Sequence, residues 1–84
     1  MIGMEQGELV GYVDTNRPFS AVIEVELGYV KREAEDGVFV VFLKSFPGAR
    51  PDNLDRWTAA KAPLEGIMRF GRFTKGRSFK WKTN

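Results

Sequence analysis

The chain contains no cysteine and no histidine. The absence of cysteine excludes disulfide bonds and thiol nucleophiles, and the absence of both excludes the usual zinc sites. Without histidine, the chain also lacks the common general base near neutral pH and every Ser-His or Cys-His nucleophile. We therefore expect a protein that is not an enzyme and has no catalytic residue, metal or cofactor. Carboxylate or lysine chemistry is the weakest alternative.

Long apolar runs are also missing. No run approaches the roughly eighteen residues that a membrane span needs, and residues 1–8 are neither basic nor followed by a long apolar stretch. These features predict no signal peptide, no membrane contact and a cytoplasmic location. The 84 residues are 43% hydrophobic, which indicates a single small globular domain over residues 1–84.

Charge is distributed unevenly along the chain. Residues 1–68 hold seven lysines and arginines against eleven acids, whereas residues 69–84 hold six lysines and arginines and no acid. Four aromatic residues are interleaved with these bases: Phe70, Phe73, Phe79 and Trp81. Bases for phosphates and rings for nucleobases are typical of nucleic-acid binding. Alternatively, the rings are core and the bases are the solvated face of the same strands.

Five segments show the pattern of β-strands. They are residues 8–13, 19–31, 38–43, 66–73 and 77–83. In the second segment, Ile23, Val25, Leu27 and Tyr29 alternate with Glu24 and Glu26, and residues 31–37 are expected to form the following loop. The third segment is apolar on both faces. Its second face must therefore be covered by the chain itself or by a partner.

One short helix is expected at about residues 52–62. Asp52 is a plausible N-cap, Leu54 and Trp57 follow at helical spacing, and Pro63 ends the segment. The order of elements is then β-β-β-α-β-β. It predicts a mainly β fold, a small five-stranded OB-like barrel with one short helix between strands three and four. An SH3-like barrel and a split sheet with the helix on one face are the alternatives.

The last two segments are expected to form a hairpin that turns at Lys75-Gly76. This turn places Phe70 opposite Trp81 and Arg72 opposite Phe79, which gathers most of the rings on one face. The shared alternation of all five segments predicts a common core. It consists of Val10, Ile23, Val25, Leu27, Val38, Val40, Phe70, Phe79 and Trp81.

Three stretches resemble the first three strands of the cold-shock domain: ELVGYVD at 8–14, RPFSAVIEVE at 17–26 and DGVFVVF at 36–42. VFVVF at 38–42 is similar to the Val-Phe-Val-His-Phe motif of that family, and LEGIMRF and TKGRSF are similar to its fourth strand and last loop. Ser20, Ala21 and Val22 depart from the family's glycine-aromatic motif, and residues 44–63 are longer than its short loop.

The resemblance implies that Val38 and Val40 face the core, whereas Phe39 and Val41 face a nucleic-acid ligand. It further implies that Tyr12, Phe19 and Phe42 extend this platform. Bases in the flanking loops and the last hairpin would contact phosphates. The complete set of predicted nucleic-acid-binding residues is Tyr12, Arg17, Phe19, Phe39, Val41, Phe42, Phe73, Lys75, Arg77, Lys80 and Lys82.

These observations predict binding of single-stranded RNA or DNA through an aromatic strand face and basic loops. The alternative is a protein-interaction module, a subunit, adaptor or inhibitor, whose apolar third strand docks on a protein partner or on a second copy. Glu24 and Glu26 favour this alternative, because carboxylates on an outward face of strand two repel phosphates.

Overall fold

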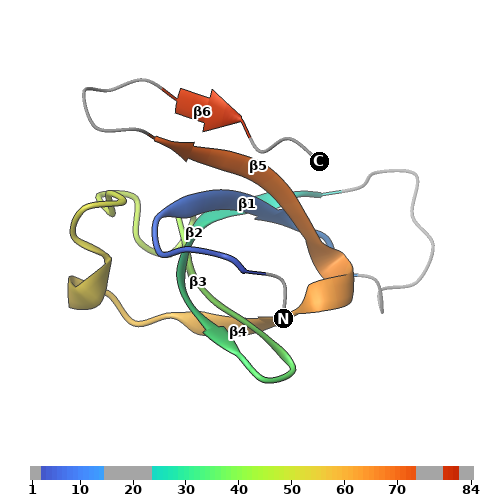
Figure 1. The fold of residues 1–84 in the computed structure, drawn as a ribbon. Coiled ribbons are helices and arrows are strands. Elements are labelled where there is room, and N and C mark those ends of the chain that lie inside the picture. The colour runs from blue at the N-terminus through green and yellow to red at the C-terminus, as the bar shows by residue number, and fades with distance from the viewer. Residues whose placement is uncertain (1–2, 15–23, 74–78, 82–84) are drawn as a thin grey trace.

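The computed structural model describes residues 3–14, 24–73 and 79–81, with residues 72, 73 and 79–81 described by their backbone alone. Its strands form one antiparallel sheet in the order β4-β3-β2-β1-β5-β6 (Figure 1). They are β1 Glu8–Tyr12, β2 Glu26–Ala34, β3 Gly37–Phe42, β4 Ala60–Pro63, β5 Ile67–Phe73 and β6 Phe79–Trp81. Two 3-10 turns, η1 Leu54–Arg56 and η2 Leu64–Gly66, lie before and after β4.

The mainly β class is confirmed, and each of the five predicted strand segments overlaps a strand of the structure. The sheet is open, because β4 and β6 form its two edges. In the part of the chain that the structure describes, no helix has the length and apolarity to cross a membrane.

The concave side of the sheet encloses an inner cluster of apolar residues. It consists of Met4, Val10, Val30, Val38, Val40 and Ala62, with Tyr12, Phe42, Leu64 and Ile67 packed against it. Val10, Val38 and Val40 are completely buried, as predicted. Their side chains alternate with outward-facing neighbours because successive residues of a strand point to opposite faces.

A second, outer cluster covers the convex side of β3. Its buried members are Val41, Ala49 and Leu54, and the side chains packed against them are Tyr29, Leu43, Phe46, Trp57 and Ala59. Most of these residues belong to the connection between β3 and β4, which folds back over the sheet. The chain therefore covers much of the second apolar face of β3 itself.

The helix predicted for residues 52–62 is wrong. Only η1 is helical there, it follows Asn53 rather than Asp52, and Asn53 makes no side-chain capping hydrogen bond. The second half of the segment is β4, in which Ala60 pairs with Val40 and Ala62 with Val38. A short segment gains little from helix propensity alone. Pairing with the buried strand β3 outweighs it.

Strand β2 differs from the prediction in its end and in its faces. It continues to Ala34, so that Glu35 and Asp36 alone form the turn to β3. The alternation predicted for residues 24–29 puts its apolar side outward: Val25 is 43% exposed and Leu27 44%. The inward position next to them is held by Gly28, where a Cβ would lie 2.5 Å from Cγ1 of Val40. No larger side chain fits there, so the apolar alternation of β2 continues on the outside.

The predicted register of the last hairpin is one residue off. Gly71 pairs with Trp81, Arg72 with Lys80 and Phe73 with Phe79. Phe70 is only half-buried. The predicted core residue Ile23 lies outside the described residues, and the burial of the Phe79 and Trp81 side chains is not described.

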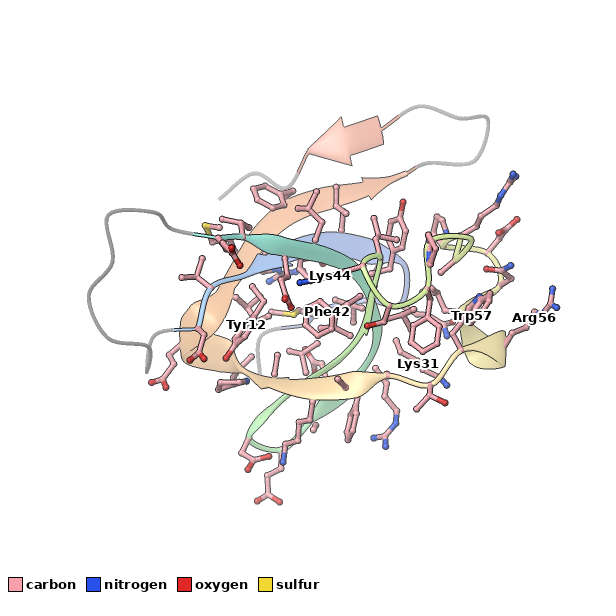
Figure 2. All side chains as sticks on the ribbon, turned by 180° about the vertical axis from the view of Figure 1, so that it is seen from behind. Tyr12, Lys31, Phe42, Lys44, Arg56 and Trp57 are labelled. Carbon is pink, nitrogen blue, oxygen red and sulfur yellow. The ribbon has the colours of Figure 1, made fainter. Side chains whose placement is uncertain are left out.

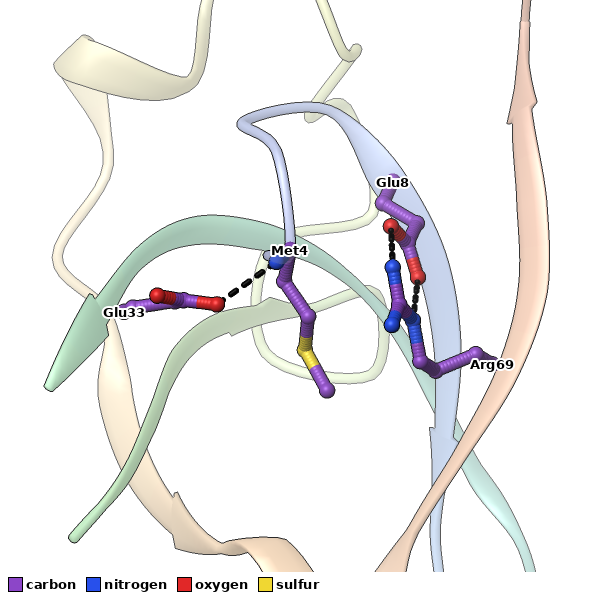
Figure 3. Close-up of polar contacts among 4 residues, drawn as sticks. All are labelled: Met4, Glu8, Glu33 and Arg69. Atoms are coloured by element: carbon purple, nitrogen blue, oxygen red, sulfur yellow. Dashed lines mark hydrogen bonds and ion pairs between the residues drawn. The ribbon is translucent and has the colours of Figure 1, made fainter. Parts of the chain in front are cut away.

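Two polar contacts hold the first strands in place (Figure 3). Arg69 donates from Nε to Oε2 of Glu8 at 2.5 Å and from Nη2 to Oε1 at 2.8 Å. These hydrogen bonds raise the pKa of Arg69, and Glu8 is only 3% exposed. The backbone N–H of Met4 donates to Oε1 of Glu33 at 2.6 Å. Arg69, the first base of the C-terminal segment, is thus committed to a structural ion pair.

Candidate nucleic-acid interface

The aromatic platform predicted from the sequence is divided between the two sides of the sheet. Tyr12 and Phe42 pack against the inner cluster, with their ring centroids 6.1 Å apart and their planes tilted by 59°. Figure 2 shows both rings inside the curve of the sheet. Phe39 belongs to the other side, because it lies between the inward residues Val38 and Val40. One strand of nucleic acid therefore cannot stack on all three rings together.

Val41 is a correction to the predicted site. Its side chain is completely buried beneath the outer cluster, where Leu54 and Trp57 lie over it. Phe46 and Trp57 pack together above this region, with ring centroids 5.1 Å apart. Val41 points outward as expected, but the connection between β3 and β4 closes the surface that a base would need.

Phe39 is the predicted ring that lies on an outer face beside cations. It is half-buried, and the guanidinium carbon of Arg32 lies 4.0 Å from its ring centroid. Arg32 is its partner on β2, and Lys61 is its partner on β4. Arg32, Phe39 and Lys61 therefore form a row across three neighbouring strands, which we call the basic row.

A bulge in β2 adds a further cation beside this row. Val30 pairs with Val40 and Arg32 with Phe39, so Lys31 is an extra residue without a partner on β3. Nζ of Lys31 donates to the backbone oxygen of Trp57 at 2.7 Å, which places it on the outer side. A regular strand would send Lys31 and Arg32 to opposite faces. The bulge lets two consecutive cations share one face.

Lys61 is partly neutralised by the turn that follows β2. Its Nζ forms an ion pair with Oδ1 of Asp36. The hydrogen bond from Lys61, together with its charge, lowers the pKa of Asp36. Both side chains are exposed, so this pair is open to exchange with another anion. The basic row thus offers the guanidinium of Arg32 over Phe39 and the ammonium of Lys61 in a solvated pair.

Several predicted contacts are not described by the structure. Phe73 and Lys80 lie in β5 and β6, at the opposite edge of the sheet from β4, and their side chains are not described. Five further predicted residues lie outside the described residues: Arg17, Phe19, Lys75, Arg77 and Lys82.

The sequence interpretation missed Arg32, Lys61 and Lys31. The sequence pattern predicts a loop at Arg32 and a helix at Lys61, because the extension of β2 and the strand β4 depend on pairing with β3. The turn residues carried a usable signal. A two-residue turn at Glu35-Asp36 pairs Ala34 with Gly37 and brings Arg32 near Phe39.

Comparison with known proteins adds no assignment. A scan against protein-family models, a search of curated proteins and a search of solved structures gave no significant match to this chain. The function is therefore argued from the geometry of the chain.

Proposed function

We propose that the protein binds single-stranded RNA or DNA, without catalysis, on the outer face where β2, β3 and β4 meet. The observation that carries this proposal is the basic row, in which an aromatic ring lies between an arginine and a lysine on adjacent strands. Single-stranded nucleic acid is bound by this combination of rings for stacking and bases for phosphates.

Arg32 is the residue on which a base stacks in this proposal. Its guanidinium covers the ring of Phe39 at 4.0 Å, so the exposed plane is that of the guanidinium rather than the phenyl ring. Bases stack on arginine planes as well as on aromatic rings. Phe39 then acts as the support that holds the guanidinium flat, and Lys61 supplies a phosphate contact beside it.

Glu24 and Glu26, whose negative charges oppose phosphate binding, lie away from the basic row. Glu26 is the first residue of β2, and Arg32 follows six positions later. At the rise of an extended strand this separates them by about 20 Å. That distance exceeds the Debye length of about 8 Å at physiological ionic strength. The repulsion from Glu24 and Glu26 is therefore largely screened at Arg32.

The bases of residues 69–84 extend this proposal without carrying it. Lys75, Arg77, Lys80 and Lys82 would add phosphate contacts, as the basic and aromatic composition of this segment predicts.

The proposed fold is a barrel, and the strand order favours the SH3-like alternative over the OB-like one. Strands β1 to β4 follow one another in the sheet, and after the 3-10 turn η2 the chain returns so that β5 pairs with β1. This meander with a returning strand supports the SH3-like alternative. In the described residues β6 pairs with β5 and makes no pair with β3, whereas the OB-like barrel closes as a Greek key.

Binding of short labelled oligonucleotides, measured by fluorescence anisotropy at two salt concentrations, tests the proposed function. Arg32→Ala should weaken binding by about 1–3 kcal/mol, the value of one base stack. Arg32→Lys keeps the charge but loses the plane, so it should lose most of the same affinity. Phe39→Ala should weaken binding in the same direction with little effect on the fold.

Lys44→Ala is the matched control, because Lys44 is an exposed cation near the other end of β2, where it pairs with Glu26 at 4.0 Å. It should leave the affinity nearly unchanged. Arg77→Ala should flatten the salt dependence by about one unit of slope if the bases of residues 69–84 take part. Flat binding curves for the unmodified protein at low salt would refute the proposal.

The alternative function is protein interaction through the apolar face of β3, and two contacts speak against it. Val41 is completely buried by the chain's own connection, and Phe39 is covered by Arg32. A partner would have to displace that connection.

A further inference from the structure

A different part of the sheet carries an exposed apolar surface. Among the side chains that the structure describes, three large apolar ones are strongly exposed: Val25 at 43%, Leu27 at 44% and Met68 at 39%. Strand pairing brings them together, because Gly11 of β1 pairs with Leu27 on one side and Met68 on the other. They lie on the outer side of β1, β2 and β5.

Gly11 makes this surface continuous. A Cβ at Gly11 would lie 2.8 Å from Cε2 of Phe70 and 2.8 Å from Cγ1 of Val25. The side chains of Phe70 and Val25 therefore close over the glycine backbone from the two neighbouring segments. We call Val25, Leu27, Met68 and Phe70 the apolar strip.

A groove of about 470 Å³ runs along one end of the apolar strip. Val25, Leu27 and Leu43 provide its apolar surface, and Glu24, Glu26 and Lys44 provide its charged groups. Contiguous exposed apolar surface with a polar rim is typical of interaction sites. Acidic and apolar residues of the segment from Glu24 to Leu27 therefore border the same groove.

The surroundings of the groove are acidic. Glu24 and Glu26 also line a neighbouring cavity of about 280 Å³ with Tyr12 and Asp14. Burial raises the pKa of Tyr12, and the charges of Asp14, Glu65 and Glu26 raise it further. Lys44 is the only cation among the described residues that line the groove, and it pairs with Glu26.

We propose that the apolar strip and its groove dock a polypeptide segment in which apolar side chains alternate with lysine or arginine. The apolar side chains of such a segment leave water against Val25, Leu27 and Leu43. Its bases meet the carboxylates of Glu24 and Glu26. This surface is separate from the basic row, so the proposal does not depend on nucleic-acid binding.

Charge complementarity selects this occupant over two others. A nucleic acid or an anionic lipid surface would be repelled by the acids that flank the groove. A second copy docked symmetrically through the same surface would bring the acids Glu24 and Glu26 to the contact twice, because both copies of a two-fold interface use the same patch. The contact is small compared with a standard interface, so weak and salt-dependent binding is expected.

The experiment uses an acetylated hexapeptide that alternates lysine with leucine or phenylalanine, and a counterpart with glutamate in place of lysine. Binding is followed by NMR shifts of backbone amides and side-chain methyls on the intact protein. The lysine peptide should shift Val25, Leu27, Met68 and Leu43 most. The glutamate peptide should bind at least about tenfold more weakly at low salt.

Leu27→Ser should weaken binding of the lysine peptide by about three- to tenfold, because part of the Leu27 side chain is buried against the bound peptide. Glu24→Gln combined with Glu26→Gln should weaken binding of the lysine peptide and reduce the salt dependence of that binding. Asp55→Asn is the matched control, because Asp55 is an exposed acid that accepts from Gln6 at 3.1 Å outside the strip. It should leave peptide binding unchanged.

Three results would overturn the proposal. One is equal binding of the two peptides, and another is a set of shifts outside both the apolar strip and its groove. The third is Leu27-dependent self-association in sedimentation, which would assign the strip to a second copy instead.

Discussion

The two faces of β3 are both apolar, but they are buried by different parts of the chain. The inner face, with Val38 and Val40, is covered by residues of the neighbouring strands and by Met4. The outer face at Val41 is covered by the connection between β3 and β4, mainly through Leu54, Phe46 and Trp57. A strand that is apolar on both faces thus needs no external partner to be covered at Val41. A connection of about seventeen residues between two adjacent strands can supply the second layer.

Phe39 marks the limit of this outer layer. The outer cluster does not include it, and the guanidinium of Arg32 covers it instead. A cation is a reversible cover, because it remains solvated on its outer side. On the same face of β3, the half at Val41 is therefore closed by the outer cluster, and the half at Phe39 is covered by the exposed side chain of Arg32.

The largest effect on this comparison is expected from Leu54→Ala. Leu54 is 2% exposed and anchors the connection over Val41, so its truncation removes burial and leaves a cavity. The free energy of unfolding should fall by about 2–5 kcal/mol. Chemical denaturation measures this loss. A loss below about 1 kcal/mol would show that the outer cluster adds little to stability.

Val40→Ala and Val41→Ala compare the inner and outer faces directly. Both side chains are completely buried, so each substitution should lower the free energy of unfolding by about 1–3 kcal/mol. Denaturant titrations of the two variants under the same conditions provide the comparison. A cost near zero for Val40→Ala would contradict its place in the inner cluster. A cost near zero for Val41→Ala alone would show a loosely packed outer layer.

The smallest effect is expected at the turn between β2 and β3. The hydrogen bond and charge of Lys61 lower the pKa of Asp36. The pair therefore contributes stability that is present above the ordinary carboxyl pKa of 3.8 and is lost as the pH falls through the lowered value. Because the pair is exposed, this contribution is small.

An NMR titration of the Asp36 carboxyl group tests this pair. Lys61→Met should return the pKa of Asp36 toward its ordinary value, whereas Lys44→Met should leave the titration unchanged. An unchanged titration of Asp36 in Lys61→Met would contradict the ion pair between Lys61 and Asp36.

Much of the sheet was predictable because its signals are local. The alternation around Val10, the apolar run at Val38 to Leu43 and the basic-aromatic pattern of Ile67–Phe73 each indicate a strand without reference to the rest of the chain. The inward direction of Val38 and Val40 is also confirmed.

The wrong predictions about strands β2 and β4 share one physical cause. Residues 60–63 have no strong preference of their own, and they become β4 because β3 offers an edge for pairing. The side of β2 that faces inward is decided by Gly28, which allows Val40 to approach closely. The bulge at Lys31 shifts the inward and outward alternation of the residues that follow it in β2. None of these contacts is visible within a short window of sequence.

The sequence by itself determined the strand class, the inner valines of β3 and the exclusion of histidine and cysteine chemistry, because these follow from residue identity and local alternation. Only the tertiary structure decided which side of each strand is covered. It buried Val41, turned Tyr12 and Phe42 inward and brought Arg32 over Phe39. The physical reason is that a side chain's burial and partners depend on residues distant in sequence that the fold packs against it.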